Sequence, residues 1–266
     1  MRRGVLAALV AFTLFPFLWG LLGSLRPESE LFGGATLLPR ALTLAHYRAL
    51  FEERAFWVPI RNSLVVAATT TLFCIAAGST AAYALARLRF RGRRMILGFI
   101  LAVTMFPQIS IVGPLFLLLR TLRLIDTYPG LILPYLTFAM PLTVWLLVGY
   151  FRQIPVELEE AARIDGASRL GVLLRIVLPL AVPGIATTAI LTFIYCWNEF
   201  LFALSFTLGA DRQTVPVAIA LFRGRYEVPW GQILAAAMVT TAPVALLVLA
   251  AQRRIVQGLT SGAVKG

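Results

Sequence analysis

Six long apolar runs constrain the fold of this chain more than any other feature of its sequence. They cover about residues 4–25, 62–86, 95–119, 127–151, 176–204 and 228–252. As a helix, each run is long enough to cross a hydrocarbon layer of about 30 Å at about 1.5 Å per residue. Backbone polar groups in lipid must be satisfied within their own segment, so the runs favour helices over strands. We therefore expect an all-α, polytopic membrane protein with six transmembrane helices in a single domain, residues 1–266.

The composition agrees with a membrane protein, with 59% hydrophobic and 14% charged residues. The first run follows Arg2 and Arg3, as in a secretory signal, but it is longer than a signal core and lacks a small-x-small cleavage site. We expect a retained helix. Cys74 and Cys196 fall inside apolar runs, which favours buried thiols over a disulfide or a metal site.

The distribution of basic residues predicts the orientation. If the N-terminus is cytoplasmic, the cytoplasmic segments hold 14 of the 24 basic residues and only four of the 12 acidic residues. The 14 are Arg2, Arg3, Arg87, Arg89, Arg91, Arg93, Arg94, Arg152, Arg163, Arg169, Arg175, Arg253, Arg254 and Lys265. The positive-inside rule then favours both termini in the cytoplasm of a multi-pass cell membrane protein. The net charge of +12 is explained by topology and attraction to anionic lipid, and we expect no nucleic acid partner.

Two further patterns concern packing. The second run places Gly78, Ala82 and Ala86 at i, i+4 spacing, which predicts a face where helices approach closely in lipid. The longest polar interval, residues 26–61, is expected outside and contains a short amphipathic helix near Thr43. It either rests on the outer interface or docks a partner. His46, the single histidine, lies there away from any ligand cluster, and we assign it no catalytic role.

A charged insertion at residues 152–179 separates the fourth and fifth runs, on the cytoplasmic side. Pro155 suits the first turn of a helix, and the glutamates that follow it favour the positive end of the helix dipole. Gly166 can adopt the left-handed conformation that ends a helix, and Ser168 can cap a second one. The expected product is a helix-turn-helix with a slim alanine face and a charged outer face. An interfacial hairpin would carry bulky residues on its buried side, so the slim face better fits a protein groove.

These residues resemble a known family. Glu160-Ala161-Ala162, Gly166 after three residues, and Ile176-x-Leu178-Pro179 after nine more are similar to the EAA loop of ABC importer permeases. The likeness extends over nearly the whole chain and is greatest to the carbohydrate-uptake subgroup, in particular the maltose-type second permease. The stretches that carry it are "NSLVVA" at Asn62, "AAYALARLRFRGRR" at Ala81, "LILPYLTFAMPLTVWLL" at Leu131, "WNEFLFAL" at Trp197 and "GLTSGAVKG" at Gly258.

The resemblance implies a type I importer permease fold and separate roles for the subunits of an importer. Glu160, Ala161, Ala162, Asp165 and Gly166 would dock on a cytosolic ATPase dimer, and the tail through Gly262, Lys265 and Gly266 would reach the same subunit. A second permease and an extracytoplasmic sugar-binding protein would complete the importer. This chain would bind no cofactor or metal, since the partner ATPase uses the ATP and Mg. The sequence has no GxxxxGK[ST] loop, so this chain is not the ATPase.

Two other classes compete with the importer. A stand-alone secondary transporter needs an ionisable group within the membrane for ion coupling, and Glu199 is the one candidate. Glu199 is expected near the outer end of its helix, within reach of water, which favours a structural or gating role over proton relay. Its neighbours Trp197 and Asn198 would line the same gate or the translocation path, and Trp197 fits an interface anchor equally well. A membrane enzyme is disfavoured, because no clustered set of His, Cys and carboxylate residues is present.

Overall fold

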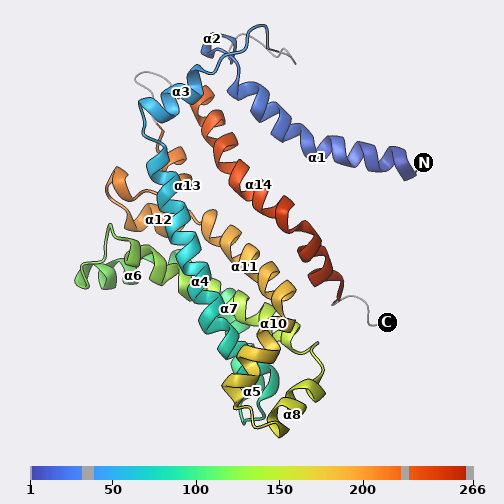
Figure 1. The fold of residues 1–266 in the computed structure, drawn as a ribbon. Helices are drawn as coiled ribbons and strands as arrows, with labels where there is room; N and C mark the ends of the chain where they lie inside the picture. The colour runs from blue at the N-terminus through green and yellow to red at the C-terminus, as the bar shows by residue number, and fades with distance from the viewer. Residues whose placement is uncertain (1, 32–38, 223–227, 262–266) are drawn as a thin grey trace.

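The computed structural model describes residues 2–31, 39–222 and 228–261, and the described part is helical without strands. Four continuous helices are long and apolar enough to cross a membrane (Figure 1). They are α1 (Arg2–Ser24), α4 (Trp57–Arg87), α7 (Tyr128–Phe151) and α14 (Trp230–Ser261). The expected six spans are reached when two bent helix pairs are each counted as one span.

The first bent pair consists of α5 (Arg93–Thr104) and α6 (Ile109–Thr121), which meet at 94°. Pro107 lies in the break and has no N–H to donate to a helical hydrogen bond. The second pair turns by 81° at Ala181, between Pro179 and Pro183. It joins Arg169–Leu180, which includes a π-helical turn at Leu173–Val177, to α11 (Val182–Trp197). The third and fifth apolar runs are therefore not straight rods.

Helix α4 packs mainly against α7, and α11 packs on both. The small-residue face predicted in the second run is confirmed, because Gly78, Ala82 and Ala86 are all buried. A Cβ on Gly78 would lie 3.2 Å from the Thr143 methyl group of α7, so glycine sets how closely the two helices approach. Cys74 and Cys196 are buried free thiols, as expected.

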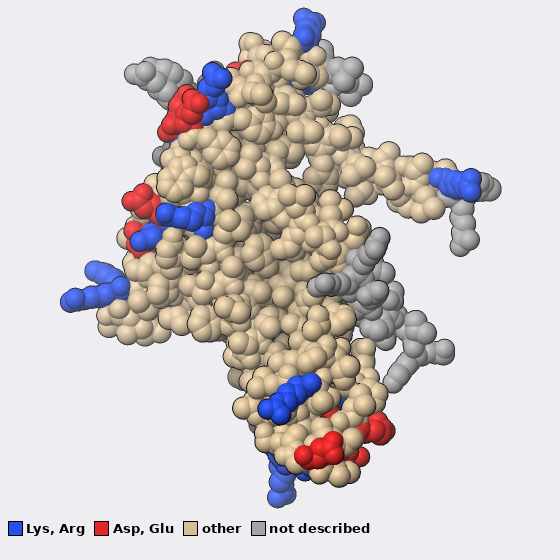
Figure 2. Space-filling model, in the orientation of Figure 1, with Lys and Arg blue, Asp and Glu red and all other residues tan. Residues whose placement is uncertain are grey.

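Helix α1 lies at the edge of the bundle and contacts α14 through its last turns. Gly20 faces Met238 and Gly23 faces Leu234, while the N-terminal half extends away from the other helices (Figure 1). Much of its apolar surface is exposed, including Phe12 at 81%. Most of the surface in Figure 2 is likewise uncharged, and the red and blue side chains gather near the ends of the molecule and its loops. Such a surface suits lipid or partner helices.

At the end that carries α2 (Glu28–Leu31) and α3 (Ala45–Glu52), the chain after α11 folds back onto the start of α4. This return contains α12 (Leu201–Phe206), a 3-10 turn at Ala210–Arg212 and α13 (Val215–Ala220). The buried Asn62 amide donates to the carbonyls of Asp211 and Gln213, both at 2.9 Å, and accepts from the Tyr128 hydroxyl at 2.7 Å. The Val215 N–H donates to the Ser63 hydroxyl oxygen at 2.8 Å. These bonds account for the polar start of "NSLVVA".

Gly184 provides a test of this packing. A Cβ at Gly184 would overlap with Cγ of Tyr150. Cγ attaches the ring to Cβ, so rotating the ring does not move it out of the way. We expect Gly184→Ala to lower the free energy of unfolding by about 2 kcal/mol through overpacking between α11 and α7. Gly149→Ala is the control, because a Cβ there meets nothing within 4 Å. Thermal unfolding in detergent measures both, and equal stability of the two variants would contradict the packing described.

Candidate functional site

The charged insertion folds as a helix-turn-helix at the opposite end of the molecule from α3 (Figure 1). Helix α8 (Val156–Ile164) begins directly after Pro155, and Glu157 and Glu159 lie in its first turn. Gly166 follows with φ +87°, the left-handed conformation predicted for it. Ser168 caps α9 (Arg169–Val172) by accepting a hydrogen bond from the Gly171 N–H at 3.1 Å. The local structure predicted for this hairpin is confirmed.

The hairpin presents one continuous face away from the bundle. Glu160, Ala161, Asp165 and Gly166 are exposed, whereas Ala162 is half-buried against the core. Ile164, on the same face, is 86% exposed. The face therefore combines small residues, an apolar side chain and carboxylates. No other described part of the chain covers it, so it is available for contact with another protein.

Glu159 departs from the expected charged outer face, because it points into the bundle. Its side chain is 7% exposed, and its Oε1 lies 2.6 Å from Nε of Arg87 at the end of α4. The Tyr83 hydroxyl donates to Oε2 at 3.2 Å. Arg87 also donates through Nη2 to the carbonyl of Ile154, just before α8. The Glu159 side chain points inward because the Arg87 cation is costly to bury alone. A paired carboxylate offsets that cost.

Sequence reasoning missed this ion pair. In the sequence, Arg87 stands out only as one of the basic residues that set the orientation, and Glu159 only as one of the acids near the start of a helix. The two lie 72 positions apart, so no local signal in the sequence links them. The pair joins the end of a membrane-crossing helix to the exposed hairpin. A displacement of α8 is therefore transmitted to α4 through a direct contact.

Removing one partner of the Arg87–Glu159 ion pair should lower the free energy of unfolding. We expect Glu159→Gln to cost about 3 kcal/mol of stability, because the Arg87 guanidinium stays buried without its counter-charge. The double variant Arg87→Leu with Glu159→Leu should recover most of that loss. Glu157→Gln, in the same turn but exposed, is the matched control. Thermal unfolding and the rate of proteolysis within residues 152–175 report the effect, and equal behaviour of the two Gln variants would refute it.

The three residues of the predicted gate lie at the other end of α11. Trp197 is buried and stacks on Phe193 with ring centroids 5.7 Å apart, so it is a packing residue. Asn198 is exposed, and its amide donates to the Ile194 carbonyl at 2.8 Å. The expectation that water reaches Glu199 is wrong, because this residue is only 8% exposed.

Glu199 is buried because α12 starts immediately after it and covers it. Its Oε1 accepts from the Phe202 N–H at 2.8 Å and its Oε2 from the Ala203 N–H at 3.0 Å. Both oxygens thus cap the first turn of α12, where a negative charge is favoured. The carboxylate therefore has a structural role, which is one of the two roles, structural or gating, expected for it from the sequence.

The remaining sequence predictions fall into two groups. Gly262, Lys265 and Gly266 lie outside the described residues. His46 is buried and bonds through Nε2 to the Arg26 carbonyl oxygen at 2.7 Å, which fits the absence of a catalytic role. Within the described ranges, no group of three or more His, Cys, Asp or Glu residues is placed to hold a metal ion.

Comparison with known proteins places this geometry in a family. The sequence pattern of the family described as "binding-protein-dependent transport system inner membrane component" matches residues 74–261, which include the whole hairpin. The chain is 48% identical to the trehalose transport system permease protein SugB of Mycobacterium tuberculosis, over 97% of this chain and 94% of that protein. It is 44% identical to the trehalose/maltose transport system permease protein MalG of Thermococcus litoralis, over 95% and 92%.

A solved structure supports the fold. A bacterial ABC transporter involved in the import of the acidic polysaccharide alginate matches with a TM-score of 0.81 and 24% identity, over 95% of this chain and 94% of that chain. Taken with the hairpin and the apolar spans, these likenesses show that the chain belongs to the family of binding-protein-dependent transport system inner membrane components.

Proposed function

We propose that this chain is one permease subunit of an ATP-driven sugar importer. It forms half of a translocation path together with a second, different permease. An extracytoplasmic sugar-binding protein delivers the solute, and a cytosolic ATPase dimer uses ATP and Mg to drive the transport cycle. The end that carries α8 faces the cytoplasm, in keeping with the excess of arginine in its segments.

The relatives support the sugar class. Two of them, from a bacterium and an archaeon, are named for transport of trehalose or of trehalose and maltose, and each aligns over more than nine-tenths of this chain. A third relative, at 43% identity, is named for transport of sulfoquinovosyl glycerol, which also contains a sugar. A sugar-containing solute is therefore the class we assign, without choosing one sugar.

The exposed hairpin is the observation that carries the coupling role. Glu160 to Gly166 form a slim, exposed surface that no other described part of the chain covers, at the end of the molecule away from the outer loops. The buried contact between Glu159 and Arg87 ties that surface to α4 at 2.6 Å. Closure of an ATPase dimer against the hairpin would therefore move membrane helices as rigid bodies.

The stand-alone secondary transporter is the weaker alternative. It depends on Glu199 binding and releasing an ion during each cycle. Both oxygens of Glu199 instead accept backbone hydrogen bonds that start α12. Releasing them would leave buried N–H groups unsatisfied in the membrane, which is costly.

A matched pair of glycines tests the coupling role. Gly166 and Gly92 both have φ +87°, both are exposed, and a Cβ at either meets nothing within 4 Å. Asn tolerates this backbone conformation, so Gly166→Asn and Gly92→Asn impose the same small strain. In vesicles containing the purified transporter, we expect Gly166→Asn to lower ATP-driven sugar uptake by at least ten-fold, because the added side chain obstructs the ATPase contact.

Gly92→Asn should keep uptake within about two-fold of the parent protein, since Gly92 lies in the α4–α5 turn and not on the hairpin. Both proteins are first compared for thermal stability, so that a folding defect is separated from uncoupling. Full uptake by Gly166→Asn, or an equal loss in both variants, would contradict a docking role for the hairpin.

A further inference from the structure

Five arginines line a cavity between the α4–α5 turn and the hairpin. The cavity has a volume of about 600 Å³. Arg87, Arg89 and Arg93 come from the turn and its flanks, and Arg163 and Arg169 come from the hairpin. Two acids, Glu159 and Glu160, also line it. Arginines therefore outnumber acids by three at one place in the fold.

Most of this positive charge is not neutralised within the chain. Glu159 is already paired with Arg87 at 2.6 Å. Arg93 donates to the carbonyl of Ala86 at 3.2 Å, which leaves the rest of its guanidinium group available. The side chains of Arg89, Arg163 and Arg169 make no ion pair or hydrogen bond with the described residues. A cluster of unpaired guanidinium groups at close quarters is stabilised by an anion that several of them can share.

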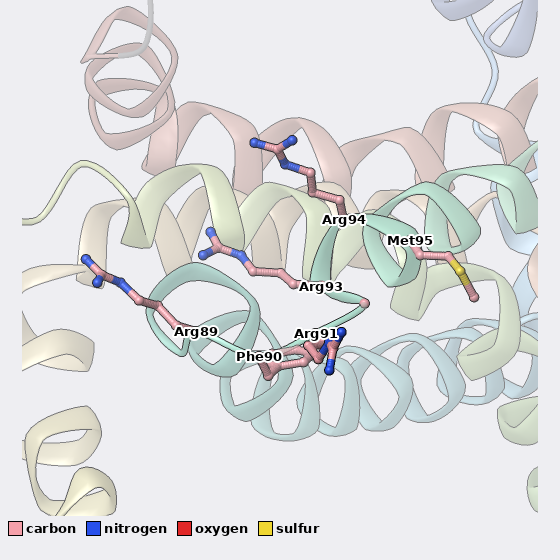
Figure 3. A pocket seen from close by; sticks show the side chains of 7 residues that line it. Arg89, Phe90, Arg91, Arg93, Arg94 and Met95 are labelled. Carbon is pink, nitrogen blue, oxygen red and sulfur yellow. The ribbon is translucent and has the colours of Figure 1, made fainter.

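The arrangement of the turn indicates where such an anion binds. In Figure 3, Arg89 and Arg93 extend to the same side of the turn, whereas Arg91 points away from them. The shallow pocket drawn there also includes Arg94 and Met95, and it shares Arg89 and Arg93 with the cavity beside the hairpin. The two hollows thus form one basic region at the junction of α4, α5 and α8.

An apolar surface continues from this basic region along α5. Met95 is 80% exposed and Phe99 is 69% exposed, one helical turn further along the same helix. A ligand that matches both parts has an anionic head and an apolar tail. Free phosphate would satisfy the arginines only, and would leave the adjoining apolar surface without a role.

We propose that this basic region binds the phosphate group of an anionic phospholipid, whose acyl chains lie along the exposed face of α5. Arginine forks bind phosphate oxygens in pairs, and basic pockets at the ends of membrane helices attract anionic head groups. Because Arg89 belongs to the α4–α5 turn and Arg163 to the hairpin, a phosphate shared by both braces the hairpin against the bundle. The assignment to the cytoplasmic leaflet rests on the orientation proposed above, but the binding itself does not.

The test measures binding and does not depend on transport. The chain, purified in mild detergent with the subunits that accompany it and stripped of bound lipid, is titrated with short-chain phosphatidylglycerol. Native mass spectrometry counts the bound lipid. Short-chain phosphatidylcholine and inorganic phosphate are titrated in parallel, since the first lacks the net charge and the second lacks the tail.

Arg89→Gln is the test variant and Arg152→Gln is its matched control. Both remove one exposed positive charge, and Arg152 lies in the segment that leads into α8 and lines neither hollow. We expect Arg89→Gln to weaken phosphatidylglycerol binding about five-fold, as one arginine contact with an anionic lipid is worth about 1 kcal/mol. Adding Arg93→Gln should bring the loss to about 25-fold on the same basis. Arg152→Gln should stay within two-fold of the parent protein.

Three results would overturn the proposal. Equal weakening by Arg89→Gln and Arg152→Gln would show general attraction to a charged surface and not a site. Binding of phosphatidylcholine as tight as that of phosphatidylglycerol would exclude recognition of net negative charge. Inorganic phosphate binding as tightly as the lipid would assign the arginines to a soluble anion. The lipid proposal and the proposed function are tested separately. If sugar uptake did not depend on ATP, the proposed function would be wrong, but these binding results would be unaffected.

Discussion

The buried contact between Arg87 and Glu159 is the interaction that fixes the hairpin to the membrane-crossing helices. An ion pair with side chains 10% and 7% exposed is stable only if each charge stays near the other, because either one alone is costly to bury. The pair therefore holds the start of the hairpin at a fixed place beneath α4. Tyr83 and the Ile154 carbonyl complete the contact. A hairpin held in this way can transmit a displacement to α4, whereas a flexible loop would move without displacing the helix.

The same reasoning extends to the opposite end of the bundle. There the return of the chain after α11 is fixed by Asn62 and Ser63 on one side and by the Glu199 cap on the other. Helix α4 thus begins at one fixed structure and ends at another. Since α4 packs on α7 and α11 along its length, the three helices form a rigid unit between the two ends. Rigid units of this kind move by rocking against a partner and not by bending.

The sequence predicted much of this fold because its signals are local. Pro155, Gly166 and Ser168 act on the backbone beside them, so the hairpin could be placed residue by residue. The lengths of the apolar runs gave the spans for the same reason. Pro107 and Pro183 lie at the two bends, but a proline does not set the angle, and the values of 94° and 81° depend on neighbouring helices. Arg87 and Glu159 lie 72 positions apart, and no local pattern links them. Glu199 was placed by helix length alone, which does not show that α12 folds back over it.

The most direct measurement is a photo-crosslink from position 164. Ile164 is 86% exposed at the centre of the hairpin face, so a photoreactive residue there should leave the fold of this chain unchanged. The account predicts that illumination in native membranes joins this position to a subunit with a GxxxxGK[ST] phosphate loop. The same residue at Leu122, exposed at the end of α6, should give no such product. If position 164 crosslinks only to lipid or to another copy of this chain, the hairpin does not dock on an ATPase, and the central claim is contradicted.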